Sequence, residues 1–111
     1  MDSILTSIKK LLGIEENYTH FDVDIIMQIN GIFSVLEQIG IGPIGGFSIK
    51  DKTTKWKDYE TDVSYDMLKS YIYLKVRLLF DPPQNSFLVN SFEKQISELE
   101  WRLNIKEKVT I

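Results

Sequence analysis

The sequence has 111 residues, no cysteine, one histidine, 13 basic against 16 acidic side chains and 43% hydrophobic residues. This length corresponds to one domain, and the composition is that of an ordinary soluble protein. The lack of cysteine excludes disulfides, thiolate metal sites and cysteine nucleophiles, and it favours a reducing compartment. A net charge of −3 gives no overall attraction to nucleic acid or anionic lipid. We expect neither a membrane span nor a signal peptide, because no apolar run and no basic N-terminus of the required kind is present.

Two amphipathic helices are predicted in the first part of the chain. Apolar residues recur every three or four positions over residues 3–12, with Ser3 or Asp2 as the N-cap. A second helix is expected to begin with Asp22 as its N-cap and to stop at Gly40. Its predicted core stripe comprises Ile25, Ile26, Ile29, Ile32, Phe33, Leu36 and Ile39.

The helical pattern breaks after the second helix. Four glycines and one proline lie within residues 40–46, which predicts a long loop up to residue 54. A single helical turn is expected around Trp56 and Tyr59.

Two further helices are predicted in the second half of the chain. Residues 63–80 are apolar over roughly 220° of the helix circumference, which predicts a helix packed on two sides. The run Asp81-Pro82-Pro83 ends it, because proline cannot donate a hydrogen bond to the helix. A last helix is expected over residues 86–104, capped by Asn85 or Ser86, with residues 105–111 as a flexible tail. The sequence therefore predicts an all-α fold, a single-domain bundle of about four helices over residues 1–111.

Two segments match ligand-binding motifs by residue type but not by structural context. The run from Gly40 to Gly45 has the letters of a dinucleotide-binding motif, but it follows a helix rather than a strand, and Pro43 removes a backbone donor. The segment from His20 to Asp24 has the residue types of a metal site, but a helix that begins at Asp22 would point the carboxylates apart. We expect no metal, no cofactor and no enzymatic activity.

A basic segment surrounds the first tryptophan. Lys50, Lys52, Lys55 and Lys57 flank Trp56, so this stretch carries +3 and the remainder of the chain −6. One interpretation is a solvated loop whose tryptophan fills the core. The other is contact with a phosphate backbone or an acidic partner.

Two residues of the later helices stand out by position. Lys75 lies between apolar stripes. This position predicts a structural lysine whose ammonium either is paired or reaches solvent at the end of a buried alkyl chain. Trp101 lies away from the core seam of its helix, on the side that also carries Phe87 and Ile105. This outer side is either an interface with another protein or a surface covered within the monomer.

Several segments together resemble the small head-tail connector proteins of tailed bacteriophages, also called adaptor or head-completion proteins. The resemblance covers residues 4–104. The segments that carry it are Phe21-Asp22-x-Asp24-Ile25-Ile26, Gln38-Ile39-Gly40-Ile41-Gly42-Pro43, Trp56, Tyr71-Ile72-Tyr73-Leu74-Lys75-Val76-Arg77-Leu78-Leu79-Phe80-Asp81-Pro82-Pro83, Ser86-Phe87, and Glu98-Leu99-Glu100-Trp101-Arg102-Leu103.

The resemblance implies an all-helical subunit that assembles with identical copies into a dodecameric ring beneath the portal. Such a ring extends the DNA channel and offers a docking face to the next head-completion or tail component. It implies a place at the head-tail junction of the virion, synthesis in the cytoplasm of the host bacterium, and no catalytic residue, cofactor or membrane.

The expected contacts follow from this role. Tyr73, Phe87, Trp101 and Ile105 are the interface candidates, and the segment containing Lys50, Lys52, Lys55 and Lys57 is the candidate for facing the channel, DNA or a neighbour. The alternative is a small helical DNA-binding or DNA-packaging accessory protein, against which the net charge argues.

Overall fold

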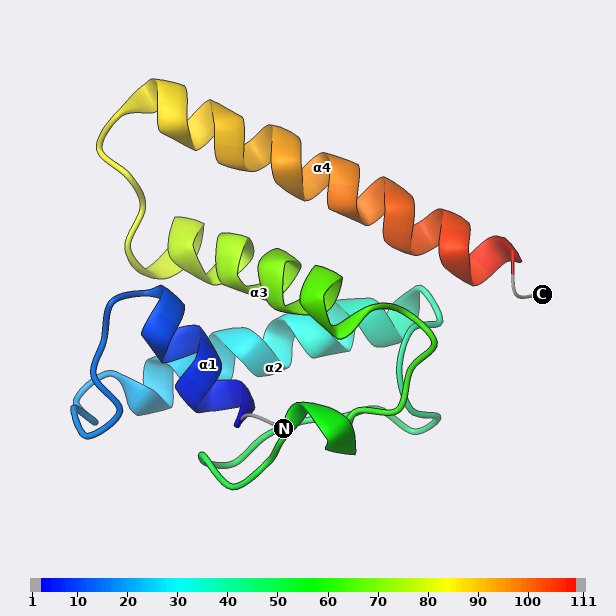
Figure 1. The fold of residues 1–111 in the computed structure, drawn as a ribbon, viewed down its shortest axis with the longest axis horizontal. Coiled ribbons are helices and arrows are strands. Elements are labelled where there is room, and N and C mark those ends of the chain that lie inside the picture. The colour runs from blue at the N-terminus through cyan, green and yellow to red at the C-terminus, as the bar shows by residue number, and fades with distance from the viewer. Residues whose placement is uncertain (1–2, 110–111) are drawn as a thin grey trace. The chain divides into compact units, whose positions relative to one another are not determined.

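The computed structural model describes the backbone of residues 3–109 and the side chains of residues 3–103. Within this range the chain forms four α-helices and one short 3-10 helix (Figure 1). They are α1 (Ile4–Leu11), α2 (Asp22–Gln38), η1 (Trp56–Asp58), α3 (Tyr65–Phe80) and α4 (Ser86–Val109). The described residues contain no β-strand, only an isolated bridge between Ser3 and Lys55. The predicted all-α class is confirmed.

The chain divides into two compact units, unit 1 (Met1–Asp62) and unit 2 (Val63–Ile111). Unit 1 contains α1, α2 and η1, and unit 2 contains α3 and α4. That the whole chain forms one domain stays a prediction.

The first helix begins as its sequence predicts. The Ser3 side chain accepts a hydrogen bond of 3.2 Å from the Thr6 amide, which satisfies one of the free N–H groups of the first turn. Ile4, Leu5 and Ile8 lie on the buried face of α1, and the helix contacts α2. The apolar spacing therefore identified most of the buried face of α1, but Leu11, which the same spacing placed on it, is 46% exposed.

The second helix differs from the prediction at its first turn. Asp22 is the first helical residue and not the N-cap; the N-cap is Phe21, whose side chain makes no capping hydrogen bond. The predicted capping role of Asp22 is wrong because its carboxylate lies 2.8 Å from the Lys9 ammonium instead. Five of the seven predicted core residues are buried: Ile25, Ile29, Ile32, Phe33 and Leu36.

Three aromatic rings hold the segment after α2 in place within unit 1. The ring of Phe33 lies 5.1 Å from that of Phe47 and 4.8 Å from that of Tyr59, measured between ring centroids. The Phe47 and Tyr59 rings are 5.0 Å apart and almost perpendicular. The Gly-rich segment therefore returns to α2 through an aromatic cluster whose residues are far apart in sequence.

Unit 2 is a pair of antiparallel helices in contact with each other (Figure 1). Ser64 caps α3, Asp81 is its C-cap, and the Asn85 side chain accepts from the amide of Phe87 at 2.8 Å to begin α4. The buried residues of unit 2 are Val63, Leu68, Tyr71, Ile72, Leu74, Val76, Ile96 and Leu103. Among the described helices, none combines the length and the apolar character needed to cross a bilayer.

The last helix continues beyond its predicted end. Its backbone is helical to Val109, whereas the sequence pattern predicted an end near Asn104. No glycine or proline follows Asn104, so no local signal stops the helix. The mobility expected of residues 105–111 stays a prediction.

A pair of glycine substitutions tests the packing of the Gly-rich segment. A methyl group at Gly42 (φ +100°) would overlap the buried Tyr59 side chain, whereas one at Gly45 (φ +94°) would meet no atom within 4 Å. Both alanine variants carry the strain of a left-handed residue, but only Gly42→Ala displaces a core ring. We expect Gly42→Ala to lower the free energy of unfolding by about 1–3 kcal/mol more than Gly45→Ala, measured by urea denaturation. Equal losses would contradict the described packing of Tyr59.

Candidate interaction surfaces

The basic segment, residues 50–57, is fixed to unit 1 at both ends. Before it, the Asn30 side chain donates to the Ile49 carbonyl at 2.9 Å and accepts from the Ile49 amide at 2.7 Å. Within it, Trp56 is only 1% exposed, and its indole N–H donates to the Ser7 hydroxyl at 3.1 Å. The tryptophan therefore fills the core, as one of the two interpretations of this segment predicted.

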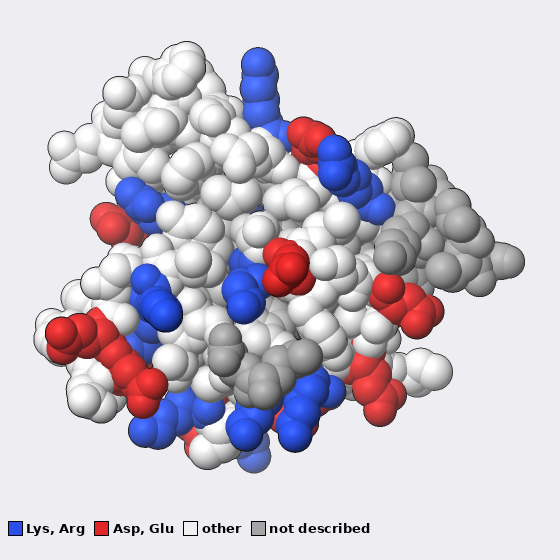
Figure 2. All heavy atoms as spheres, viewed as in Figure 1, with Lys and Arg blue, Asp and Glu red and all other residues white. Residues whose placement is uncertain are grey.

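The four lysines of the basic segment project from this fixed frame. Lys50, Lys52, Lys55 and Lys57 are all exposed. On the face drawn in Figure 2, basic side chains gather along the lower edge of the molecule. A hydrogen-bonded backbone with exposed ammonium groups is suited to bind a phosphate backbone or an acidic partner. The long lysine side chains can adjust to the positions of the negative charges without a movement of the backbone.

An aspartate turn orders the backbone between the first lysines. The Asp51 carboxylate accepts from the Thr53 amide at 2.8 Å and from the Thr53 hydroxyl at 2.5 Å. These two hydrogen bonds, chiefly that from the hydroxyl, lower the pKa of Asp51 below its ordinary value. The carboxylate is fully exposed, so this turn shapes the segment without adding much stability.

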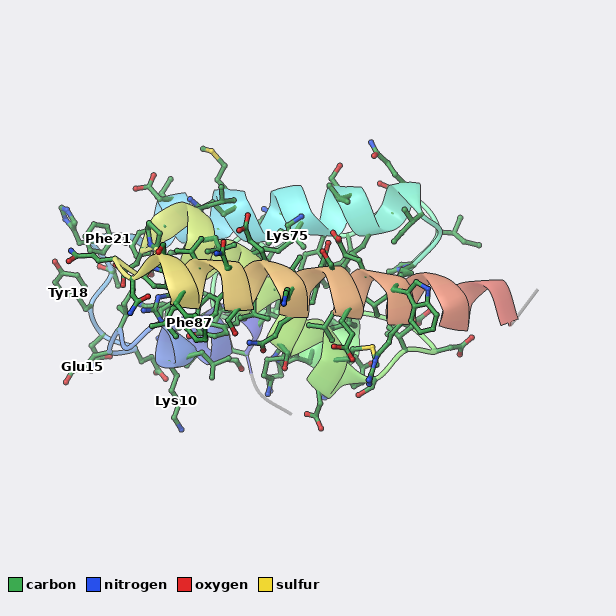
Figure 3. The ribbon with its side chains drawn as sticks, turned by 90° about the horizontal axis from the view of Figure 1, so that it is seen from above. Lys10, Glu15, Tyr18, Phe21, Lys75 and Phe87 are labelled. Carbon is green, nitrogen blue, oxygen red and sulfur yellow. The ribbon has the colours of Figure 1, made fainter. Side chains whose placement is uncertain are left out.

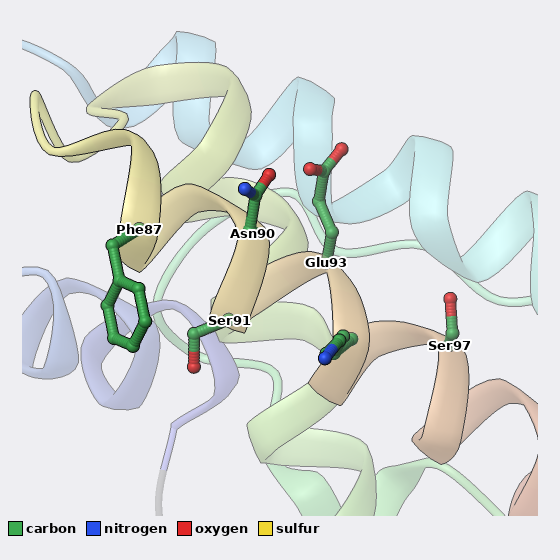
Figure 4. A pocket seen from close by; sticks show the side chains of 6 residues that line it. Phe87, Asn90, Ser91, Glu93 and Ser97 are labelled. Atoms are coloured by element: carbon green, nitrogen blue, oxygen red, sulfur yellow. The ribbon is translucent and has the colours of Figure 1, made fainter.

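The outer face of α4 carries two large exposed side chains. Phe87 is 77% exposed and Trp101 64% exposed, and the two are separated by 14 positions, which is four helical turns. Between them lies a shallow hollow on the same helix (Figure 4), lined by Phe87, Asn90, Ser91, Glu93, Lys94 and Ser97. Exposed aromatic residues beside a hollow lined by polar and charged side chains are typical of protein contact surfaces.

The remaining interface candidates are placed differently. Tyr73 is half-buried, and its hydroxyl accepts from the Arg77 guanidinium at 3.0 Å. The guanidinium also lies 5.7 Å from the centre of the Phe92 ring. The side chain of Ile105 lies outside the described residues. Of the four candidates, Phe87 and Trp101 share one exposed face.

Lys75 belongs to a polar network inside unit 2. Its ammonium lies 5.4 Å from the Tyr71 ring centre and 3.9 Å from the Glu100 carboxylate, with 28% of its side chain exposed. The Tyr71 hydroxyl donates to Glu100 at 2.9 Å. Burial and the neighbouring carboxylate raise the pKa of Tyr71 above its ordinary value, so the hydroxyl stays protonated. This lysine is paired and structural, as its position predicted.

The most buried charge in unit 1 is Lys9, which the sequence analysis did not single out. Its side chain is 2% exposed, and its ammonium donates to the carbonyls of Glu16 and Tyr18 at 3.0 and 2.7 Å. The third partner is Asp22, 2.8 Å away. The sequence could have predicted this burial, because Lys9 lies four positions after Leu5 and so next to the buried face of α1.

This lysine closes the turn between α1 and α2. Its three partners lie in the turn and at the start of α2, where Tyr18 and Phe21 are in contact, with ring centroids 5.9 Å apart (Figure 3). The ammonium donates two hydrogen bonds to carbonyls and forms an ion pair with the Asp22 carboxylate, so the buried charge is compensated. Its role is therefore structural, and it leaves no free ammonium for chemistry.

The residues of the two ligand-motif look-alikes in the sequence make other contacts in the structure. No group of three or more His, Asp or Glu side chains in the described part converges on a common point. The Asp22 carboxylate is engaged by Lys9, and Gly42 lies against Tyr59 rather than at an open helix N-terminus.

Comparison with known protein families gives a match over nearly the whole chain. The model of a family described as phage connector protein matches residues 4–110, nearly the whole chain. No curated protein and no solved structure matches the chain at the same stringency.

Two matched aspartate substitutions test the role of the Lys9 pair. Asp22→Ala leaves an ammonium that is 2% exposed without its counter-charge, and we expect a loss of about 3 kcal/mol in the free energy of unfolding. Asp24→Ala removes an exposed acid from the same helical turn, and we expect a loss below about 1 kcal/mol. Chemical denaturation of both variants measures the difference. Similar losses would mean that the pair does not anchor the turn.

Proposed function

The chain belongs to the phage connector family, and from this premise we propose that it is a head-tail connector subunit that assembles as a ring under the portal. The ring extends the channel through which DNA passes and presents a docking face to the next head-completion or tail component. The match to nearly the whole chain is the observation that carries this proposal. The subunit is made in the host cytoplasm and ends at the head-tail junction of the virion.

The distribution of apolar surface supports an assembly role. Phe87 and Trp101 remain largely exposed on α4, although the chain has buried apolar side chains on every described helix. Large aromatic groups left in water favour association, because each removes on the order of 100–200 Å² of apolar surface when covered. We propose that subunits do not form the ring by themselves in solution and become ordered in it when the portal presents a template, without catalysis.

The basic segment supports a position near DNA. Its four exposed lysines are held by a buried tryptophan, so they form a fixed local patch on a chain with net negative charge. Such a patch attracts phosphate without sequence preference. In the ring, copies of residues 50–57 would line the channel or face a neighbouring subunit.

Mass measurement tests the ring. We expect the purified protein to show the mass of a monomer or small oligomer by itself, and a complex with many copies per portal when the portal is added. Native mass spectrometry or light scattering gives both values. An unchanged mass over a wide range of portal concentration would contradict the proposed role.

A charge-matched pair of variants tests the channel position. Replacement of Lys50, Lys52, Lys55 and Lys57 by glutamine removes the positive patch, whereas replacement by arginine keeps it. We expect particles completed with the glutamine variant to lose packaged DNA faster than wild type, and those completed with the arginine variant to retain it. Nuclease sensitivity of the packaged DNA provides the measurement. Equal retention in all three would exclude a channel role for the segment.

The second candidate function is a DNA-binding accessory protein that acts as a monomer or dimer. The same exposed lysines favour it, and a gel shift at several salt concentrations separates the two functions. Binding by the isolated protein that weakens steeply with salt indicates direct phosphate contacts. Binding that requires the assembled ring supports the connector.

A further inference from the structure

The hinge between α3 and α4, residues 81–85, is held by few contacts (Figure 1). Asp81 is tied to Arg77, because its amide donates to the Arg77 carbonyl at 2.9 Å and its carbonyl accepts from the guanidinium at 2.8 Å. Residues 82–84 make no hydrogen bond to any described part of the chain. The two consecutive prolines bias the residues before them towards extended backbone. Straightening the hinge at residues 82–84 therefore breaks no hydrogen bond and follows the backbone preference.

The contact between α3 and α4 is small on the side of α4. Ile96 and Leu103 are the only described side chains of α4 that are buried. The Tyr71 hydroxyl on α3 donates to the Glu100 carboxylate on α4 at 2.9 Å. None of these groups belongs to the hinge, so α4 of another copy can make the same contacts on the same α3.

Exposed apolar side chains flank the hinge on both sides. Leu79 is 66% exposed two positions before it, and Phe87 and Leu88 are 77% and 45% exposed two and three positions after it. If two copies exchanged their last helix, one hinge would arrive and another would leave at this place. The second hinge segment would cover apolar surface that the separate subunit leaves in water, and this burial favours the exchanged arrangement.

We infer that neighbouring subunits of the ring exchange α4, so that α4 of one copy packs on α3 of the next. This inference rests on the proposed function and names a second copy of the chain as the partner of α3. Each copy gives α4 to one neighbour and receives α4 from the other, a head-to-tail exchange that continues until the ring closes.

The length of the hinge limits where exchange can occur. Five extended residues span at most about 17 Å, so the two copies must already be in contact. Assembly on the portal supplies this contact, because it holds copies side by side at a high effective concentration. We therefore expect exchange in the assembled ring and not between dilute separate subunits.

Mixing two isotopic forms of the protein tests the exchange. Lys75 and Glu100 lie 3.9 Å apart on α3 and α4, and both are partly exposed, so a carbodiimide can join them as an amide. Equal amounts of unlabelled chain and chain labelled with heavy nitrogen are mixed, assembled on the portal, cross-linked and digested. We expect about half of the Lys75–Glu100 peptide pairs to combine one light and one heavy peptide, because exchanged helices pair at random with the two labels.

A second ion pair provides the internal control. Lys9 and Asp22 lie 2.8 Å apart within unit 1, and their cross-link should join only peptides of the same label. Mixed pairs that were equally frequent at both sites would reflect random contact and would overturn the inference. So would mixed Lys75–Glu100 pairs that were equally frequent without the portal.

The same sample separates this inference from the proposed function, because light scattering gives the mass of the assembly. A complete ring in which all Lys75–Glu100 pairs carry a single label would overturn the exchange and leave the proposed function standing. Failure of the wild-type chain to form a ring with the portal would overturn both.

Substitutions beside the hinge provide a further measurement. We expect Leu79→Gln/Phe87→Gln to lower the mixed fraction about threefold or more, because exchange then buries less apolar surface. The urea midpoint should change little, because both side chains are exposed in the separate subunit. Met27→Gln removes an equally exposed apolar side chain from α2, and it should leave the mixed fraction unchanged. A wild-type mixed fraction in the hinge variant would overturn the inference.

Discussion

The buried ammonium of Lys9 is the constraint on which unit 1 depends. A charge that is 2% exposed must be surrounded by acceptors, and the chain supplies two carbonyls and one carboxylate within 3.0 Å. These acceptors come from the turn after α1 and from the first residue of α2. The Lys9 ammonium therefore ties the turn after α1 to the first residue of α2.

Elsewhere in unit 1, buried and hydrogen-bonded residues likewise hold the backbone while the side chains between them are exposed. Trp56 and Tyr59 are buried and hydrogen bonded through Ser7 and the Ile41 carbonyl, respectively, and Asn30 fixes the backbone of Ile49. The lysines between these anchors are exposed. A surface of this kind recognises charge with little loss of backbone entropy on binding, because its backbone is already ordered. The proposed channel role requires this property.

The candidate sites were visible in the sequence to different degrees. The basic segment and the exposed aromatic residues Phe87 and Trp101 follow from residue type and helical spacing, and the structure places them as exposed groups. The capping role assigned to Asp22 was wrong, because a local pattern contains no information about an ammonium thirteen residues earlier in the chain. The exposure of Val23, Met27 and Val35 on α2 was missed, and Ile39, which the sequence placed in the core stripe, is 37% exposed.

The sequence by itself determined the helices, the caps at Ser3 and Asn85, the breaks at the glycines and prolines, and the family to which the chain belongs. The helices, caps and breaks depend on contacts between residues at most four positions apart. The family follows from the similarity of nearly the whole sequence. Only the tertiary structure decided which polar groups are buried together and which apolar groups stay in water. Lys9 and Trp101 illustrate the reason, because burial is a property of everything that surrounds a residue, and these surroundings are assembled from distant parts of the chain.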